Sequence, residues 1–450
     1  MDVRWTPPPA EQALGLGFYV TATPGFPGRL KQRPEDFRVD EISASPVPDP
    51  DGPYTILRVV SRNWEQHELS QRLATALGLA PHALAWSGTK DRRAVAERLV
   101  SYRGRPPDGP VSIPDVEIRE AYTARDGLSL GHHFGNAFTV RLGVDPSGWE
   151  AATTRARATA EALRARHGFA NLFGPQRFGE VRPVTHEVGR CLVHQDIAGA
   201  VRTYLCAIPD GGDSVGVDAR RSYAEHGDPV RALREFPPFF RFERTLLDRL
   251  ARGDSPARAL HALPRELRVL FVHAYQSLLF NRWVTARVDA GLPLDDVVIG
   301  DHVVRVGRDG TVRGADAVPV AASNLAECQV TVRRGGARLA GPLVGFETPE
   351  LTDAPGAILA ELLRAEAVER HDFALRAMPE LASAGTWRPV WVDLPPLGLA
   401  EEPPRPGDGE GDAAVTVSFA LPKGSYATVL LREFLKEGAT APPASTSGAP

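Results

Sequence analysis

The first part of the chain carries short runs in which apolar and polar positions alternate, the pattern of half-buried β-strands. Residues 54–60 (YTILRVV) are also rich in β-branched side chains. Similar runs follow at 96–103, 116–125 and 136–144. We therefore predict several strands of one sheet between residues 54 and 144.

Segments with helical spacing of apolar residues lie between and after these strands. In residues 67–79 the apolar positions recur at three- and four-residue spacing, and Gly78 stands near the end, where glycine commonly stops a helix. Residues 149–168 carry a second helical pattern that ends at Gly168. Helix and strand thus share the first part of the chain.

Helices dominate from about residue 185 to 290. The most periodic stretch is 264–288, where Val272, Leu279 and Trp283 follow one face. Further on, the pattern predicts two strands and then one helix, at 301–306, 328–334 and 356–370.

Residues 401–412 (EEPPRPGDGEGD) are rich in proline, glycine and acid, and this composition predicts a linker. A last strand and helix follow at 414–436. The tail at 438–450 is too polar to fold alone, so we expect disorder there. No internal repeat is found, and 450 residues suggest two or three domains.

The composition is that of a globular protein, with 43% hydrophobic and 24% charged residues. No run of 18 apolar residues and no signal peptide are found, so we expect a cytoplasmic protein without a membrane segment. Three cysteines cannot form a disulfide framework. Cys191-x-x-His194 is half of a zinc pattern without its second half, so no metal is expected. The net charge of -4 does not exclude a local basic cleft.

The 52 basic residues include only four lysines, Lys31, Lys90, Lys423 and Lys436. A lysine kept in such an arginine-rich chain suggests a need for a compact ammonium, which the planar guanidinium does not imitate. The alternative is chance placement. Lys436 lies in the final helix outside any motif, so its replacement by arginine is expected to be nearly silent.

The segment SGTKDRRA, residues 87–94, places Asp91 among Lys90, Arg92 and Arg93. Nearby positive charge favours the ionised carboxylate, which can act as a nucleophile or base while the cations hold phosphates. The flanking patterns place Asp91 on a connection beside a sheet. The alternative is a solvated turn whose ion pairs contribute ~0–1 kcal/mol each.

The segment ANLFGPQRFGE, residues 170–180, mixes aromatic rings with amide and guanidinium groups. Aromatic stacking combined with hydrogen bonds to base edges suits an unstacked nucleobase. The alternative is a structural loop around two buried phenylalanines. The candidate side chains are those of Asn171, Phe173, Gln176, Arg177 and Phe178.

Together, these segments resemble the TruD family of tRNA pseudouridine synthases. Six segments resemble family motifs, appear in family order and span nearly the whole chain. They are LKQRPEDFRVDE (30–41), GTKDRRAV (88–95), GNAFTVRL (135–142), NLFGPQRFG (171–179), FVHAYQSLLFN (271–281) and LPKGSYATVLLREF (421–434).

The resemblance implies an α+β fold. A pseudouridine synthase catalytic domain with a mixed, largely antiparallel sheet is expected at 1–180 and 390–437. A helix-rich TRUD insertion domain is expected at 181–389. The disordered tail at 438–450 should follow the last part of the catalytic domain. A V-shaped molecule that holds RNA between its domains should result.

The resemblance also implies a reaction, the isomerisation of uridine to pseudouridine in tRNA, at uridine 13, without cofactor or metal. Asp91 maps onto the essential aspartate, the catalytic nucleophile, and Lys31 and Lys90 are expected as its electrostatic partners. Phe173 should lie against the flipped base, with Asn171 holding its loop. The remaining candidates for RNA binding are Arg92, Arg93, Gln176, Arg177, Lys423 and Tyr426.

Two positions depart from the family pattern. Leu172 stands where relatives often carry an aromatic residue, which could alter a contact near the base. Gln66 stands in a segment where many have threonine, which could alter a helix cap.

Three alternatives are open to test. One is the same isomerisation at other RNA uridines, and another is a non-catalytic RNA-binding protein. The intact Lys90-Asp91 pair speaks against the second, since a retired active site tends to lose its nucleophile first. A carboxylate-based hydrolase is disfavoured because no second acid stands at a matching motif. Few signals suggest a dimer, so a monomer is the default expectation.

Overall fold

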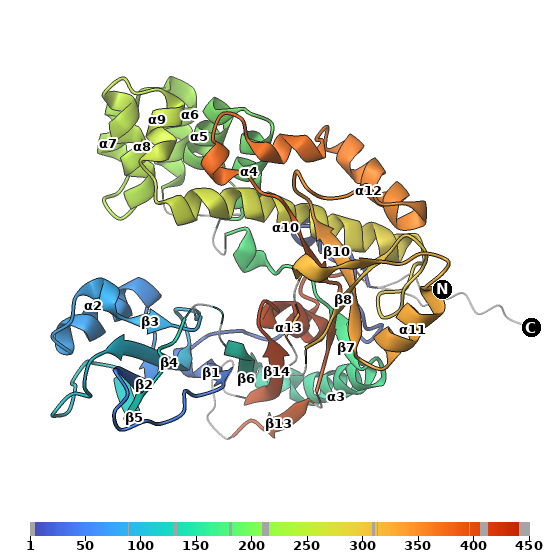
Figure 1. The fold of residues 1–450 in the computed structure, drawn as a ribbon, viewed down its shortest axis with the longest axis horizontal. Coiled ribbons are helices and arrows are strands. Elements are labelled where there is room, and N and C mark those ends of the chain that lie inside the picture. The colour runs from blue at the N-terminus through green and yellow to red at the C-terminus, as the bar shows by residue number, and fades with distance from the viewer. Residues whose placement is uncertain are drawn as a thin grey trace, which may run out of the picture.

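The ribbon divides into two arms that meet near α3 and α11 (Figure 1). A sheet occupies one arm, and helices occupy most of the other. This mixed arrangement agrees with the predicted α+β class. The structure is a computed structural model that describes residues 5–88, 90–129, 131, 133–179, 182–208, 216–307, 311–312, 314–395, 397–405 and 413–440.

Within these described residues the main sheet has eight strands in the order β13-β14-β6-β1-β4-β2-β5, with β3 beside β4. β1 and β4 run parallel, and the other neighbouring pairs are antiparallel. The predicted mixed, largely antiparallel sheet is therefore confirmed. The strands are β1 (Phe37–Ser43), β2 (Tyr54–Arg62), β3 (Ala85–Trp86), β4 (Val95–Arg103), β5 (Val116–Ala124), β6 (His133–Val144), β13 (Gly398–Glu402) and β14 (Ala413–Pro422).

Two helices flank the sheet at opposite ends. Helix α2 (Gln66–Ala76) buries Leu69 and Leu73, and Glu65 caps its first turn through the amides of the two residues after Gln66. Helix α3 (Trp149–Ala165) packs against β14 through a row of buried alanines and Leu163. Small side chains let its backbone approach the strand closely.

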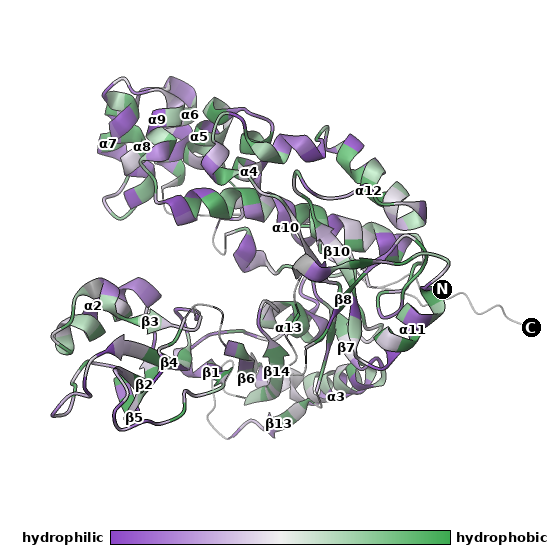
Figure 2. Cartoon of the chain, in the orientation of Figure 1, coloured by the Kyte–Doolittle hydropathy of each residue, from purple (hydrophilic) through white to green (hydrophobic). Residues whose placement is uncertain are grey.

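The helical arm is built around α10 (Arg265–Asp289), which packs against α4, α12 and β10. The predicted helix at 264–288 is therefore confirmed. Hydrophilic and hydrophobic positions mix along the shorter helices of this arm (Figure 2). These helices are α4 (Thr185–Val193), α5 (Ile197–Cys206), α6 (Val217–His226), α7 (Pro229–Glu235), α8 (Arg241–Ala251), α9 (Pro256–His261) and α12 (Asp353–Ala365).

Two small sheets lie outside the main one. In the first, β10 (Ala337–Leu343) pairs with β11 (Thr386–Pro389) and β8 (His302–Arg305), and β8 pairs with β9 (Val318–Pro319). In the second, β12 (Trp391–Asp393) pairs with β7 (Gly168–Ala170), which lies before the helical arm in the chain. We propose the predicted division at 180 and 389 because the chain rejoins its first part from β12 onward.

Two predicted segments differ in the structure. Residues 328–334 were predicted as a strand but belong to helix α11 (Leu325–Arg333), so this prediction is wrong. Its β-branched residues suggested alternation, but the buried positions are Cys328 and Val332, four residues apart, and Val330 is 46% exposed. The predicted linker begins inside β13, which runs to Glu402.

Residues near the two ends of the described chain pair with each other. Thr6 pairs with Thr440, so the first three residues of the predicted tail, 438–440, belong to the described structure. Residues 441–450, the rest of that tail, lie outside the described residues. Near the other end, α1 (Pro9–Ala13) contributes Glu11, which accepts a hydrogen bond of 2.6 Å from Arg432 in α13 (Ala427–Leu435).

Lys436, directly after α13, is buried rather than on an exposed helix surface. Its Nζ donates to Thr21 Oγ1 at 2.8 Å and to the carbonyl oxygen of Thr23, and burial lowers its pKa to about 8. The larger guanidinium of Lys436→Arg must displace these neighbours. We therefore expect the free energy of unfolding to fall by about 1–3 kcal/mol in urea denaturation, against the sequence expectation of silence.

The control is Lys423→Arg, because the Lys423 side chain is exposed and a guanidinium can also donate to the carbonyl oxygen of Gly131 that Lys423 contacts. Its unfolding midpoint should equal that of the unchanged protein. Equal midpoints for both variants would contradict the structural role of Lys436.

Candidate active site

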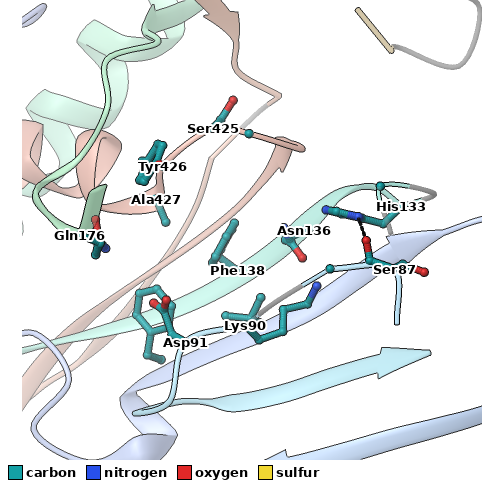
Figure 3. A pocket seen from close by; sticks show the side chains of 15 residues that line it. Ser87, Lys90, Asp91, His133, Asn136, Phe138, Gln176, Ser425, Tyr426 and Ala427 are labelled. Atoms are coloured by element: carbon teal, nitrogen blue, oxygen red, sulfur yellow. Dashed lines mark hydrogen bonds between the residues drawn. The ribbon is translucent and has the colours of Figure 1, made fainter. Parts of the chain in front are cut away.

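A pocket of about 400 Å³ opens beside β1 and β6 (Figure 3). Phe37 and Phe138 line it from these strands, and Tyr426 lines it from the loop before α13. The segment between β3 and β4 supplies a fourth wall. The pocket is therefore assembled from strands and loops that are far apart in the chain.

Asp91 lies on the predicted connection beside the sheet, between β3 and β4, and it lines this pocket. Lys31 Nζ donates to Asp91 Oδ2 at 2.7 Å and lies 4.3 Å from the centre of the Phe37 ring. The side chain of Lys31 is 11% exposed and that of Asp91 is 40% exposed. The site thus offers an accessible carboxylate beside a nearly buried ammonium.

Lys90 has a different partner from the one that the sequence suggested. Its Nζ donates to Glu41 Oε2 at 2.9 Å, and both side chains are only 2% exposed. Burial lowers the pKa of Lys90, and the Glu41 carboxylate opposes this shift. Of the two expected partners, the structure pairs Lys31 with Asp91 and pairs Lys90 with Glu41 in the pocket wall.

Arg92 and Arg93 are exposed and do not line the pocket. Arg93 donates to the carbonyl oxygen of Gln32, which lies next to Lys31 in the chain. Both arginines directly follow Asp91 in the chain, and both are exposed.

Asn171 connects its loop to two neighbouring residues. Its Nδ2 donates to the carbonyl oxygen of Pro389 at 2.9 Å, and its Oδ1 accepts from Arg388 at 2.7 Å. Arg388 also donates to the carbonyl oxygen of Gly424 at 2.8 Å. This arginine, which no sequence pattern singled out, joins the loop at 171 to the loop before α13.

Phe173 is 5% exposed and does not line the pocket. The Arg388 guanidinium lies 4.0 Å from the centre of its ring, and Tyr426 meets it edge to face at 5.8 Å. Tyr426 itself lines the pocket, so Phe173 stands behind it in this structure. Asn281, from α10, accepts from the amide of Phe173 at 2.8 Å and fixes the loop.

The remaining candidates take three different positions. Gln176 lines the pocket and accepts from Thr428 Oγ1 at 2.8 Å. Arg177 lies outside the lining, where it donates to Ser277 at 3.1 Å, and burial lowers its pKa. Lys423 is exposed, and its Nζ donates to the carbonyl oxygen of Gly131 at 2.7 Å.

Sequence reasoning missed four polar residues of the pocket wall, Ser87, His133, Asn136 and Ser425. Ser87, Asn136 and Ser425 stand inside segments already singled out as motifs, so their positions were a usable signal. No pattern marked His133. Its place in the pocket wall depends on tertiary structure.

The two departures from the family pattern lie away from the pocket opening. Leu172 is 1% exposed and belongs to the hydrophobic core, not to the lining. Gln66 does not cap α2, because Glu65 does. The Oε1 of Gln66 instead accepts a hydrogen bond from the buried Arg98.

No group of three or more His, Cys, Asp or Glu side chains that could hold a metal ion occurs in the part of the chain that the structure describes. Over the same residues, no helix has the length and apolar character needed to cross a bilayer.

Known proteins are similar to this chain in both sequence and fold. The family model for tRNA pseudouridine synthase D (TruD) matches residues 13–434. A protein named probable tRNA pseudouridine synthase D from Methanococcoides burtonii is 34% identical over 436 residues, which are 95% of this chain and 98% of the relative. One of the same name from Halobacterium salinarum is 36% identical over 442 residues, with the same shares covered.

A crystal structure assigned to tRNA pseudouridine synthase D from Methanosarcina mazei superposes with a TM-score of 0.79 at 28% identity, covering 97% of this chain and 99% of that one. The fold and the matched motifs together define a pseudouridine synthase. The chain belongs to the TruD family.

Proposed function

We propose that this protein isomerises uridine to pseudouridine in tRNA, at uridine 13, with Asp91 as the nucleophile. The observation that carries the proposal is the accessible Asp91 carboxylate, paired with Lys31 at 2.7 Å, in an aromatic pocket of about 400 Å³. Pockets of this size suit small planar ligands, and aromatic walls suit a base taken out of its stack.

In the reaction, the N1–C1′ bond of uridine breaks, uracil turns, and its C5 bonds to C1′. The proton on C5 is lost and N1 takes up a proton, so the product is an isomer of the substrate. The target must leave its stack, at a cost of a few kcal/mol. Phe37, Phe138 and Tyr426 offset this cost by contact with the extruded base. Lys31 holds the carboxylate of Asp91 in position for the reacting nucleotide.

The decisive experiment incubates the protein with unmodified tRNA transcripts and maps pseudouridine by carbodiimide-based primer extension. A single stop at position 13 is expected. Stops at other positions would support the alternative of other uridines. Binding without any stop would support a non-catalytic RNA-binding protein.

Binding to tRNA should weaken steeply with salt, because phosphate contacts release counterions. Arg92 is exposed beside Asp91, so Arg92→Ala should make the slope of log K against log salt shallower by about 1. Filter binding over a salt series measures this slope.

Arg333→Ala is the matched control. Arg333 is also an exposed arginine; it pairs with Asp296 and lies on α11, at the junction of the two arms and away from β3 and β4 in Figure 1. Its slope should remain that of the unchanged protein. An unchanged slope for Arg92→Ala would remove Arg92 from the RNA-binding surface.

A further inference from the structure

His133 is held in one tautomer. Its Nδ1 lies 2.9 Å from the carbonyl oxygen of Ser87, and the amide of Gly131 donates to the same oxygen at 2.8 Å. A carbonyl oxygen can only accept, so Nδ1 must carry the hydrogen. In the neutral ring the other nitrogen, Nε2, then carries a lone pair and acts as an acceptor.

The position of the ring is also constrained. A Cβ at Gly88 would lie 2.8 Å from His133 Cε1, so glycine is what allows the imidazole to lie there. Lys423 donates to the carbonyl oxygen of Gly131 and ties down the same turn. Figure 3 shows the second ring nitrogen directed away from Ser87, toward the side where Asn136 and Ser425 lie.

Burial and the nearby cations favour the neutral form of His133. Burial lowers its pKa first, and the Lys90 ammonium lowers it further. Lys423 acts in the same direction, whereas Glu41 and the hydrogen bond to Ser87 oppose the shift. Because the pKa lies below its ordinary value, the neutral form, with Nε2 as acceptor, dominates at neutral pH.

Two further polar groups of the same pocket lack partners. Asn136 Oδ1 and Ser87 Oγ are buried without a hydrogen bond to any described residue. Buried polar groups are nearly always paired in folded proteins, so unpaired ones in a pocket wall indicate that a polar ligand enters at this wall. Asp91 lies at the opposite end of the pocket in Figure 3.

We propose that His133 recognises the base: its Nε2 accepts the N3–H of uracil, while Asn136 Nδ2 donates to an adjacent carbonyl oxygen of the ring. This inference rests on the proposed function. A uracil whose glycosidic end faces Asp91 presents the N3 edge to the far end of the pocket, where His133 lies. Cytosine has a lone pair at N3, which would face the lone pair of Nε2, so the site would reject it.

The test measures binding in the Asp91→Asn background, so that no chemistry follows. Three synthetic tRNAs carry uridine, cytidine or 3-deazauridine at the target position. The last keeps the shape of uracil but replaces N3–H by C–H. We expect uridine to bind about 10- to 100-fold more tightly than either analogue, which is the range for one hydrogen bond to a buried acceptor.

Adding His133→Leu should reduce this preference to less than about threefold, because leucine cannot accept a hydrogen bond. His133→Gln, whose amide oxygen can accept, should retain part of the preference and serves as a second variant if the leucine protein unfolds. His371→Leu, a change at an exposed histidine, should keep the full preference. An undiminished preference for uridine in both His133 variants would overturn the proposal.

Failure of this inference differs from failure of the proposed function. If the unchanged protein forms pseudouridine while the His133 variants keep the preference, only the role of His133 is rejected. If the unchanged protein forms none, the proposed function itself fails.

Discussion

Asp91→Asn is expected to lower the rate of pseudouridine formation by at least about 1,000-fold while the protein remains folded. The amide keeps nearly the same shape but loses the charge and the nucleophilic oxygen. The side chain is 40% exposed, so no buried core depends on it. Single-turnover assays on tRNA measure the rate, and thermal unfolding checks the fold.

The matched control is Asp145→Asn. Asp145 is also a half-exposed carboxylate, and it pairs with the basic side chain of Arg29 at 2.7 Å. It lies outside the pocket lining, so its rate should equal that of the unchanged protein. Substantial turnover by pure Asp91→Asn protein would exclude Asp91 as the nucleophile.

Lys31→Arg is expected to lower the single-turnover rate by about 100-fold, although it conserves charge. Lys31 Nζ lies between Asp91, at 2.7 Å, and the face of the Phe37 ring. The Lys31 side chain is only 11% exposed. A planar guanidinium would displace the carboxylate, and a misplacement of ~1 Å can cost on the order of 100-fold in rate. Binding to tRNA should change little, because the charge remains.

Arg252→Lys is the control for exchanging the two basic residues. Arg252 is an exposed residue after α8 that pairs with Asp248 at 2.8 Å. We expect no change in rate. Near-normal activity of Lys31→Arg would mean that a compact ammonium is not required beside Asp91. The presence of lysine at position 31 would then be a matter of chance.

Local patterns carried much of the prediction. The helical period of 264–288 and the alternation of 54–60 depend on neighbouring residues, and both elements occur as expected. The six motifs, in order, indicated the family, and the patterns that flank Asp91 placed it on a connection beside the sheet. The strand predicted at 328–334 failed because β-branched residues mimicked alternation in a helix whose buried face repeats every four residues.

The identity of the family and the candidate nucleophile were determined by the sequence alone, because motif residues and their order can be read without knowing the fold. The partners of these residues were decided only by tertiary structure. Lys90 meets Glu41, and Asn171 meets Arg388, across 49 and 217 residues of chain. His133 gained its fixed tautomer from Ser87, 46 residues earlier. Such contacts depend on how strands pair and how the chain returns from the helical arm, and no local pattern encodes that.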